Sequence, residues 1–204
     1  MKYIYTLFSL IIVCILFSPL NGAVFTDIYG THVTLGDEGE LNGPGLTVLW
    51  DGLKNWNVEN IFLLVDMYGA SSIENENEPA ETTRFYAPLT AGAEYRYLAF
   101  SLPLYLIVSA KGGAIYYRKE APEQYGPYTD PSSTEAFNET GAYCAADFGI
   151  LWIISQNFSF IMKAGYQQPF GLGSAIEDTA GGMQYSVGFR YTLSGYHRSL
   201  NYYE

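Results

Sequence analysis

The sequence has little positive charge and little cysteine. Lys and Arg number 10 against 21 Asp and Glu, giving a formal net charge of −11. This balance argues against nucleic acid as a partner, because domains that bind nucleic acid carry clustered basic residues. There are two cysteines, and Cys14 falls within an N-terminal apolar run. Since only Cys144 lies outside that run, no intramolecular disulfide is expected to hold the fold.

Helical patterns are also missing. After residue 23 the sequence shows no long stretch of helical periodicity and no apolar run that could span a membrane as a helix. Histidine is confined to His32 and His197, and no acidic segment has the ligand spacing of a calcium-binding loop. We therefore expect no metal site and no cofactor.

The first 23 residues have the layout of a secretory signal peptide. Lys2 precedes an apolar run that ends at Pro19, and the small residues Gly22 and Ala23 follow. Cleavage is expected after Ala23, and the alternative is an uncleaved membrane anchor over residues 4–20. The mature chain, about 180 residues, has the length of one domain.

The clearest pattern in the mature chain is the alternation in residues 183–193. Met183, Tyr185, Val187, Phe189, Tyr191 and Leu193 alternate with Gln184, Ser186, Gly188, Arg190 and Thr192. Side chains point to opposite faces along an extended strand, so this segment predicts one apolar face and one polar face. Its length, about eleven residues, is that of a tilted strand crossing a bilayer.

The same rhythm continues along the rest of the chain. It predicts eight strands at residues 24–35, 44–53, 58–72, 83–97, 102–119, 140–154, 158–170 and 183–193. Their connections are expected to alternate long and short. The four long loops (36–43, 73–82, 120–139 and 171–182) hold 14 of the 21 acidic residues and no Lys or Arg. An abundance of tyrosine and phenylalanine, 19 and 12 residues, suits strands that pass a boundary between water and lipid.

The polar faces of these strands carry charge. Eight charged residues lie opposite the apolar faces: Asp66, Arg84, Glu94, Arg96, Lys111, Asp147, Lys163 and Arg190. If the apolar faces meet lipid, all eight point into the barrel. An eight-stranded barrel encloses only enough space for side chains, so we expect a network of ion pairs that fills a polar lumen.

The closing strand resembles that of the outer-membrane β-barrels, in which a glycine is followed three and five residues later by bulky apolar residues, here Gly188, Tyr191 and Leu193. The usual terminal aromatic is replaced by a tail, residues 194–204, expected in the periplasm. Across nearly the whole mature chain the pattern resembles the small eight-stranded barrels of the OmpA, OmpX and OmpW type. The resemblance implies an all-β, antiparallel up-and-down transmembrane barrel over residues 24–193.

It also implies a location in the bacterial outer membrane, contact with outer-membrane lipid, insertion by the barrel-assembly machinery and a monomeric state. The function expected is a structural or surface-interaction role with acidic extracellular loops. The alternatives are a narrow channel for small or hydrophobic solutes and a secreted soluble barrel that binds an apolar ligand inside.

No catalytic residue is expected. His197 and Ser199 match the His-x-Ser of outer-membrane lipid A deacylases, but they follow the closing strand instead of lying on a strand near the outer leaflet. His32 is expected to be an ordinary strand residue. Cys144 is expected to be a small hydrophobe on the lipid-facing side, with an intermolecular disulfide as the alternative.

Overall fold

The computed structural model describes residues 22–36, 39–51, 53, 58, 60–74, 82–99, 103–125, 128–172 and 181–194. These residues fold into β1 (Val24–Thr34), β2 (Glu40–Trp50), β3 (Ile61–Tyr68), β4 (Ala70–Glu74), β5 (Thr82–Leu98), β6 (Leu104–Tyr125), β7 (Tyr128–Ser155), β8 (Phe158–Phe170) and β9 (Gly182–Ser194). The described part contains no helix that is long and apolar enough to cross a membrane.

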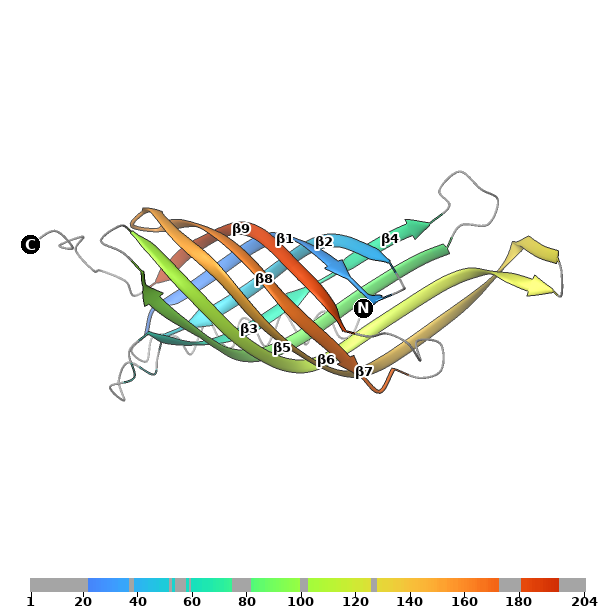
Figure 1. The fold of residues 1–204 in the computed structure, drawn as a ribbon, viewed down its shortest axis with the longest axis horizontal. Helices are drawn as coiled ribbons and strands as arrows, with labels where there is room; N and C mark the ends of the chain where they lie inside the picture. Colours follow the sequence, from blue (N-terminus) through green and yellow to red (C-terminus); the bar gives the residue numbers. More distant parts are fainter. Residues whose placement is uncertain are drawn as a thin grey trace, which may run out of the picture.

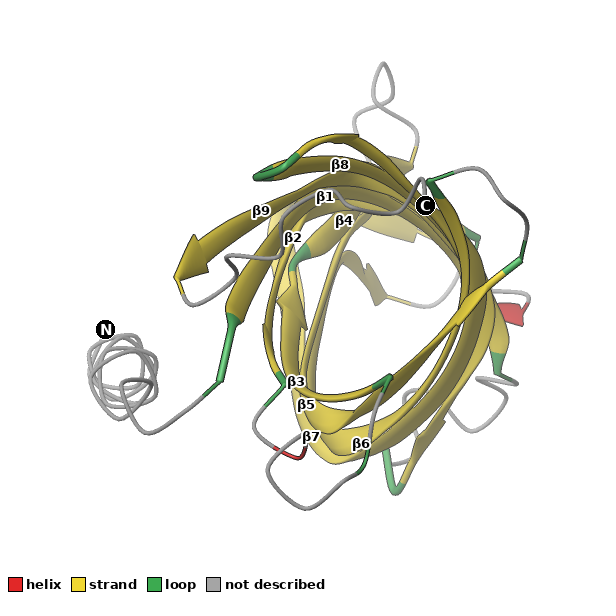
Figure 2. Ribbon diagram, turned by 90° about the vertical axis from the view of Figure 1, so that its left-hand side faces the viewer, coloured by secondary structure: helices red, strands yellow, loops and turns green. Residues whose placement is uncertain are grey.

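The strands close into an eight-stranded antiparallel barrel (Figures 1 and 2). The strands pair antiparallel in chain order, with β3 and β4 together acting as one barrel strand, and β1 also pairs with β9, which closes the ring. β3 and β4 follow one another along a single barrel strand, and both pair with β2 and β5. The predicted up-and-down barrel is confirmed.

The break between β3 and β4 lies at Gly69, where the backbone approaches β2 closely. The amide of Gly69 donates to the carbonyl of Pro44 at 3.1 Å. A Cβ atom on Gly43 would lie 1.7 Å from the carbonyl oxygen of Gly69, so only glycine at position 43 permits this approach. The predicted single strand over residues 58–72 is therefore interrupted, and it begins later, at Ile61.

Two predicted loops are wrong. The loop over residues 36–43 is cut short because β2 begins at Glu40, whose Cα pairs with that of Thr34. The loop over residues 120–139 is mostly a hairpin, because β6 and β7 pair with each other up to Tyr125 and Tyr128. Both connections are thus short, and the predicted alternation of long and short connections does not hold at these hairpins.

The apolar faces point outward, as predicted. The six apolar residues of β9 are between 40% and 48% exposed. Phe85, Phe148 and Tyr191, on three different strands of the barrel wall, are exposed by 40%, 56% and 47%.

The interior is layered along the barrel axis. We call the end of the barrel that holds the turn between β7 and β8 the short-turn end. Near it, a buried apolar cluster contains Phe25, Leu49, Phe62 and Leu64. Toward the opposite end, a larger cluster of aliphatic and tyrosine side chains closes the barrel. Buried charged side chains lie between the two.

Candidate functional site: the charged interior of the barrel

The eight charged residues predicted to face the lumen all lie on the inner side of the barrel wall. The exposed fractions are 3% for Asp66, 7% for Arg84, 0% for Glu94, 7% for Arg96, 6% for Asp147 and 2% for Arg190. The side chains of Lys111 and Lys163 are 6% and 12% exposed. Charges buried this deeply must be paired to avoid a large desolvation cost.

The first cluster lies around Arg190 of β9, and we call it the Arg190 cluster. Its guanidinium donates to Asp27 through Nε at 2.5 Å and Nη2 at 2.7 Å. It also donates to Glu94 through Nη1 at 2.6 Å and Nη2 at 2.9 Å. Lys163 adds contacts of 3.1 Å to Glu94 and 3.6 Å to Asp27, and Arg96 Nε donates to Glu94 at 3.0 Å. The cluster joins strands β1, β5, β8 and β9 across the lumen.

The second cluster lies around Lys111 of β6, and we call it the Lys111 cluster. The ammonium group of Lys111 lies 2.6 Å from Asp66 Oδ2 and 3.2 Å from Asp147 Oδ2. Asp66 also accepts hydrogen bonds from the hydroxyls of Tyr29 at 2.5 Å and Thr47 at 2.7 Å. This cluster links β1, β2, β3, β6 and β7.

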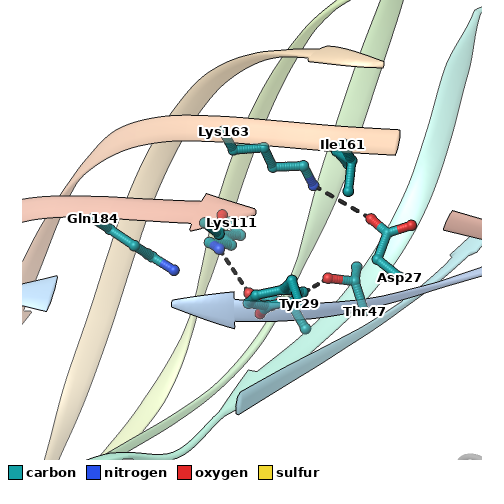
Figure 3. A pocket seen from close by; sticks show the side chains of 9 residues that line it. Asp27, Tyr29, Thr47, Lys111, Ile161, Lys163 and Gln184 are labelled. Carbon is teal, nitrogen blue, oxygen red and sulfur yellow. Dashed lines mark hydrogen bonds and ion pairs between the residues drawn. The ribbon is translucent and has the colours of Figure 1, made fainter. Parts of the chain in front are cut away.

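The space between the clusters is small. A cavity of about 10 Å³ is lined by residues of both, including Asp27, Asp66, Lys111 and Lys163 (Figure 3). That volume corresponds to roughly one water molecule. The described interior is therefore filled by side chains at this level.

A layer of tyrosine and glutamine side chains lies beyond the Lys111 cluster, toward the end opposite the short turns. Gln167 Oε1 accepts hydrogen bonds from Tyr68 at 2.7 Å, Tyr143 at 2.8 Å and Tyr86 at 3.3 Å. The hydroxyl of Tyr143 also lies 3.4 Å from Oε1 of Gln184. Five strands thus share one polar network that blocks the lumen above the charges.

Sequence reasoning missed several of these interior residues. Asp27 is 0% exposed and makes two hydrogen bonds to Arg190, yet β1 showed the weakest alternation. The inner face of β1 also carries Phe25, Tyr29 and Val33, whereas its outer face includes Thr26 and His32, so the inner face is the more apolar one. The one available signal was the alternation of faces along the strand, which places Asp27 on the same side as Tyr29 and Thr31.

Arg84 is the one predicted lumen residue outside both clusters. It lies near the start of β5, level with Ser72 and Lys119, whereas Glu94 and Arg96 lie near the opposite end of the same strand.

The closing-strand residues divide between the two faces of β9. Tyr191 and Leu193 point outward and are 47% and 46% exposed. Gly188 points inward, and a Cβ atom there would lie 2.5 Å from Cβ of Tyr29. Their role as an assembly signal stays a prediction.

The remaining sequence candidates have simple surroundings. Cys144 is exposed on the outer face of β7. Nδ1 of His32 lies 2.8 Å from Oδ1 of Asn42 on the neighbouring strand. His197, Ser199, residues 1–21 of the predicted signal peptide and residues 195–204 of the predicted tail lie outside the described residues. Among the described residues, no group of three or more His, Cys, Asp or Glu is placed to hold a metal ion.

Comparison by sequence finds no match: no known family profile and no curated protein matches the chain. Comparison by structure does. A major outer membrane protein from Thermus thermophilus superimposes with a TM-score of 0.59 at 10% identity, covering 84% of this chain and 100% of that one. The attachment invasion locus protein Ail of Yersinia pestis gives 0.55 at 13% identity, covering 84% and 97%.

Neisserial surface protein A gives a TM-score of 0.52 at 12% identity, covering 84% of this chain and 97% of that one. All three structures cover the barrel almost completely although few residues are shared. The chain therefore has the fold of the small eight-stranded outer-membrane β-barrel proteins.

Proposed function

We propose that this chain is a bacterial outer-membrane protein whose barrel is a closed anchor and whose protruding hairpin contacts partners outside the cell. The proposal has three supports: an apolar outer surface, a filled interior and a hairpin that extends beyond the barrel wall.

The outer surface is one that lipid can cover. Aromatic side chains gather near both ends of the barrel: Trp50, Tyr95, Tyr97, Trp152 and Tyr191 near the short turns, and Phe85, Tyr116, Tyr166, Phe170 and Tyr185 near the other end. Val108, Phe148 and Val187 are exposed between them. Two aromatic belts around an apolar band are typical of transmembrane barrels. A soluble barrel would leave this surface in water, which argues against the secreted ligand-binding alternative.

The filled interior favours an anchor over an open channel. The Arg190 cluster, the Lys111 cluster and the tyrosine and glutamine layer follow one another along the axis, and the cavity between the clusters holds about 10 Å³. A solute could pass only if buried ion pairs opened, which costs several kcal/mol. The narrow-channel alternative would therefore require a rearrangement of these pairs.

The β6–β7 hairpin carries the surface-interaction role. β5 pairs with β6 only as far as Glu120, and β8 pairs with β7 only as far as Ala142. Beyond these points, as far as the structure describes the chain, the two strands pair only with each other, and the hairpin projects from the end of the barrel (Figure 1). Such a ribbon presents free backbone groups along both edges, a surface that can pair with an added strand.

The charge of the hairpin suggests the kind of partner. Residues 120–139 contain five acidic residues and no Lys or Arg. Ail, which has a similar fold, has been crystallised with the heparin analogue sucrose octasulfate. A polysulfate would be repelled by this hairpin, so we propose a basic partner surface instead.

Cell fractionation combined with a hairpin variant tests the proposal. An epitope inserted between residues 125 and 128 should be detected by antibody on intact cells, in the outer-membrane fraction. Cells that display the full chain should adhere to amine-coated beads more than to sulfate-coated beads. Replacing residues 121–135 by a two-residue turn should remove that preference while the barrel stays folded on gels. Recovery in the soluble periplasmic fraction, or adhesion unchanged by the shortened hairpin, would contradict the proposal.

Bilayer recording of the purified protein separates the anchor from the channel. The filled interior predicts no steady single-channel conductance for the wild-type barrel. Regular conductance steps would favour the narrow-channel alternative.

A further inference from the structure

A second cavity opens at the short-turn end of the barrel, below the Arg190 cluster. Its volume is about 80 Å³. The polar part of its lining includes Arg96, Gln156 and Ser159, and the apolar part includes Leu151 and Ile153. Gln156 is exposed, so the cavity communicates with solvent at this end. It has space for a small organic molecule of a few heavy atoms.

Arg96 is held rigidly at the wall of this cavity. Its guanidinium carbon lies 3.4 Å from the ring centroid of Phe62 and 4.7 Å from that of Phe25. Stacking on aromatic rings and the hydrogen bond from Nε to Glu94 fix the plane of the guanidinium. The residue is 7% exposed, and its Nη2 is buried without a hydrogen-bond partner in the described part of the chain. A buried guanidinium N–H without an acceptor is costly, so this position suits an acceptor from outside the chain.

The local charge also favours an anion. In the Arg190 cluster, three cations (Arg96, Lys163 and Arg190) surround two carboxylates (Asp27 and Glu94). Arg96 and Arg190 both line the cavity, and no Asp or Glu is among its described lining residues. One positive charge is thus left over beside a partly solvated space. A single negative charge would balance it, and a dianion would exceed it.

We propose that this cavity binds a small monocarboxylate. One carboxylate oxygen accepts from the guanidinium of Arg96, whose planar shape matches the planar carboxylate. The hydroxyl of Ser159 is available as a second donor on the cavity wall. A short alkyl chain would contact Leu151 and Ile153, where a hydrated inorganic anion would leave apolar surface uncovered. The site would therefore bind an anion from the short-turn side without opening the ion pairs above it.

Binding of sodium butyrate to the folded protein in detergent micelles tests the site, with isotope-labelled butyrate followed by NMR. Saturable binding at one site is expected, and inorganic phosphate should compete weakly. Arg96→Gln removes the charge and the donor, so affinity should fall about tenfold or more, as expected for loss of a charge-assisted hydrogen bond. Arg118→Gln is the matched control, because Arg118 is exposed and pairs with Glu120 far from the cavity.

A second variant keeps the test decisive if Arg96→Gln does not fold. Ser159→Leu fills the cavity from β8 without touching an ion pair, and it should also abolish butyrate binding. Folding of every variant is checked by heat-dependent mobility on gels. Absence of saturable binding to the wild-type barrel, wild-type affinity in Ser159→Leu, or tighter binding of phosphate than of butyrate would each overturn the proposal.

Discussion

Replacing Glu94 by glutamine should destabilise the barrel more than any exposed charge replacement. The carboxylate of Glu94 is 0% exposed and contacts three cations, with N–O distances of 2.6 and 2.9 Å to Arg190, 3.0 Å to Arg96 and 3.1 Å to Lys163. In Glu94→Gln, three buried cations would share the single carboxylate of Asp27. Breaking a buried ion pair from one side costs about 3–5 kcal/mol, and we expect a loss of unfolding free energy in that range.

The control uses the same substitution at an exposed ion pair. Glu120 pairs with Arg118, and the two side chains are 37% and 48% exposed. Glu120→Gln should therefore cost less than about 1 kcal/mol. A second comparison adds Lys163→Met to Glu94→Gln, which returns the cluster to its wild-type net charge. We expect this double variant to recover part of the loss, because the two side chains are in direct contact.

The measurement is urea unfolding in lipid vesicles, followed by tryptophan fluorescence and by mobility on gels. If Glu94→Gln costs no more than Glu120→Gln, the Arg190 cluster does not hold the barrel together. If the double variant is no more stable than Glu94→Gln, the loss does not come from uncompensated positive charge.

Three further predictions follow from particular positions. Val187→Arg places a charge on the exposed apolar band and should cost about 2–4 kcal/mol in lipid vesicles, and an unchanged urea midpoint would contradict the lipid-facing assignment of β9. Gly45→Ala should lower the free energy of unfolding by about 1–3 kcal/mol, because the added Cβ would lie 2.2 Å from ring atoms of Tyr29 and displace the Tyr29 hydroxyl from Asp66. Wild-type stability of this variant would show that the ring can move freely. Gln167→Met removes the acceptor shared by three buried tyrosines and should lower the free energy of unfolding by about 1–3 kcal/mol in the same assay. An unchanged free energy would mean that water takes the place of the amide.

The faces of the barrel could be predicted from sequence wherever the two sides of a strand differ. The segment of residues 158–170 was predicted with the bounds that β8 has. Met183 to Leu193 alternate with polar residues, so the outward side of β9 was evident. β1 gave a misleading signal, because its inner residues Phe25, Tyr29 and Val33 are more apolar than outer residues such as Thr26 and His32. Asp27 was missed for this reason.

The hairpin was missed for a different reason. Residues 120–139 are rich in proline, serine and glutamate, which are typical of loops. Pairing of β6 with β7 overrides that composition, and the ladder shifts register between Pro122 and Glu123, next to a residue that lacks an amide hydrogen.

The partners of the interior charges could not be predicted at all. Alternation shows that Arg190 and Glu94 point inward, but it does not show which residues meet across the lumen. That depends on the stagger of the strands around the barrel, which brings Arg190 of β9 next to Glu94 of β5, 96 positions earlier in the chain. The surplus positive charge and the cavity beside Arg96 follow from that stagger and were likewise hidden.

The environment of a probe on the outer wall tests the account most directly. Phe148 is 56% exposed between the two aromatic belts, and Asn157 lies in the exposed turn between β7 and β8. A nitroxide attached through Phe148→Cys, in a Cys144→Ser background in lipid vesicles, should collide readily with oxygen and rarely with a water-soluble nickel chelate. The same label at Asn157→Cys should show the reverse. If the label at position 148 meets the nickel chelate as often as the label at position 157 does, the outer wall faces water and not lipid.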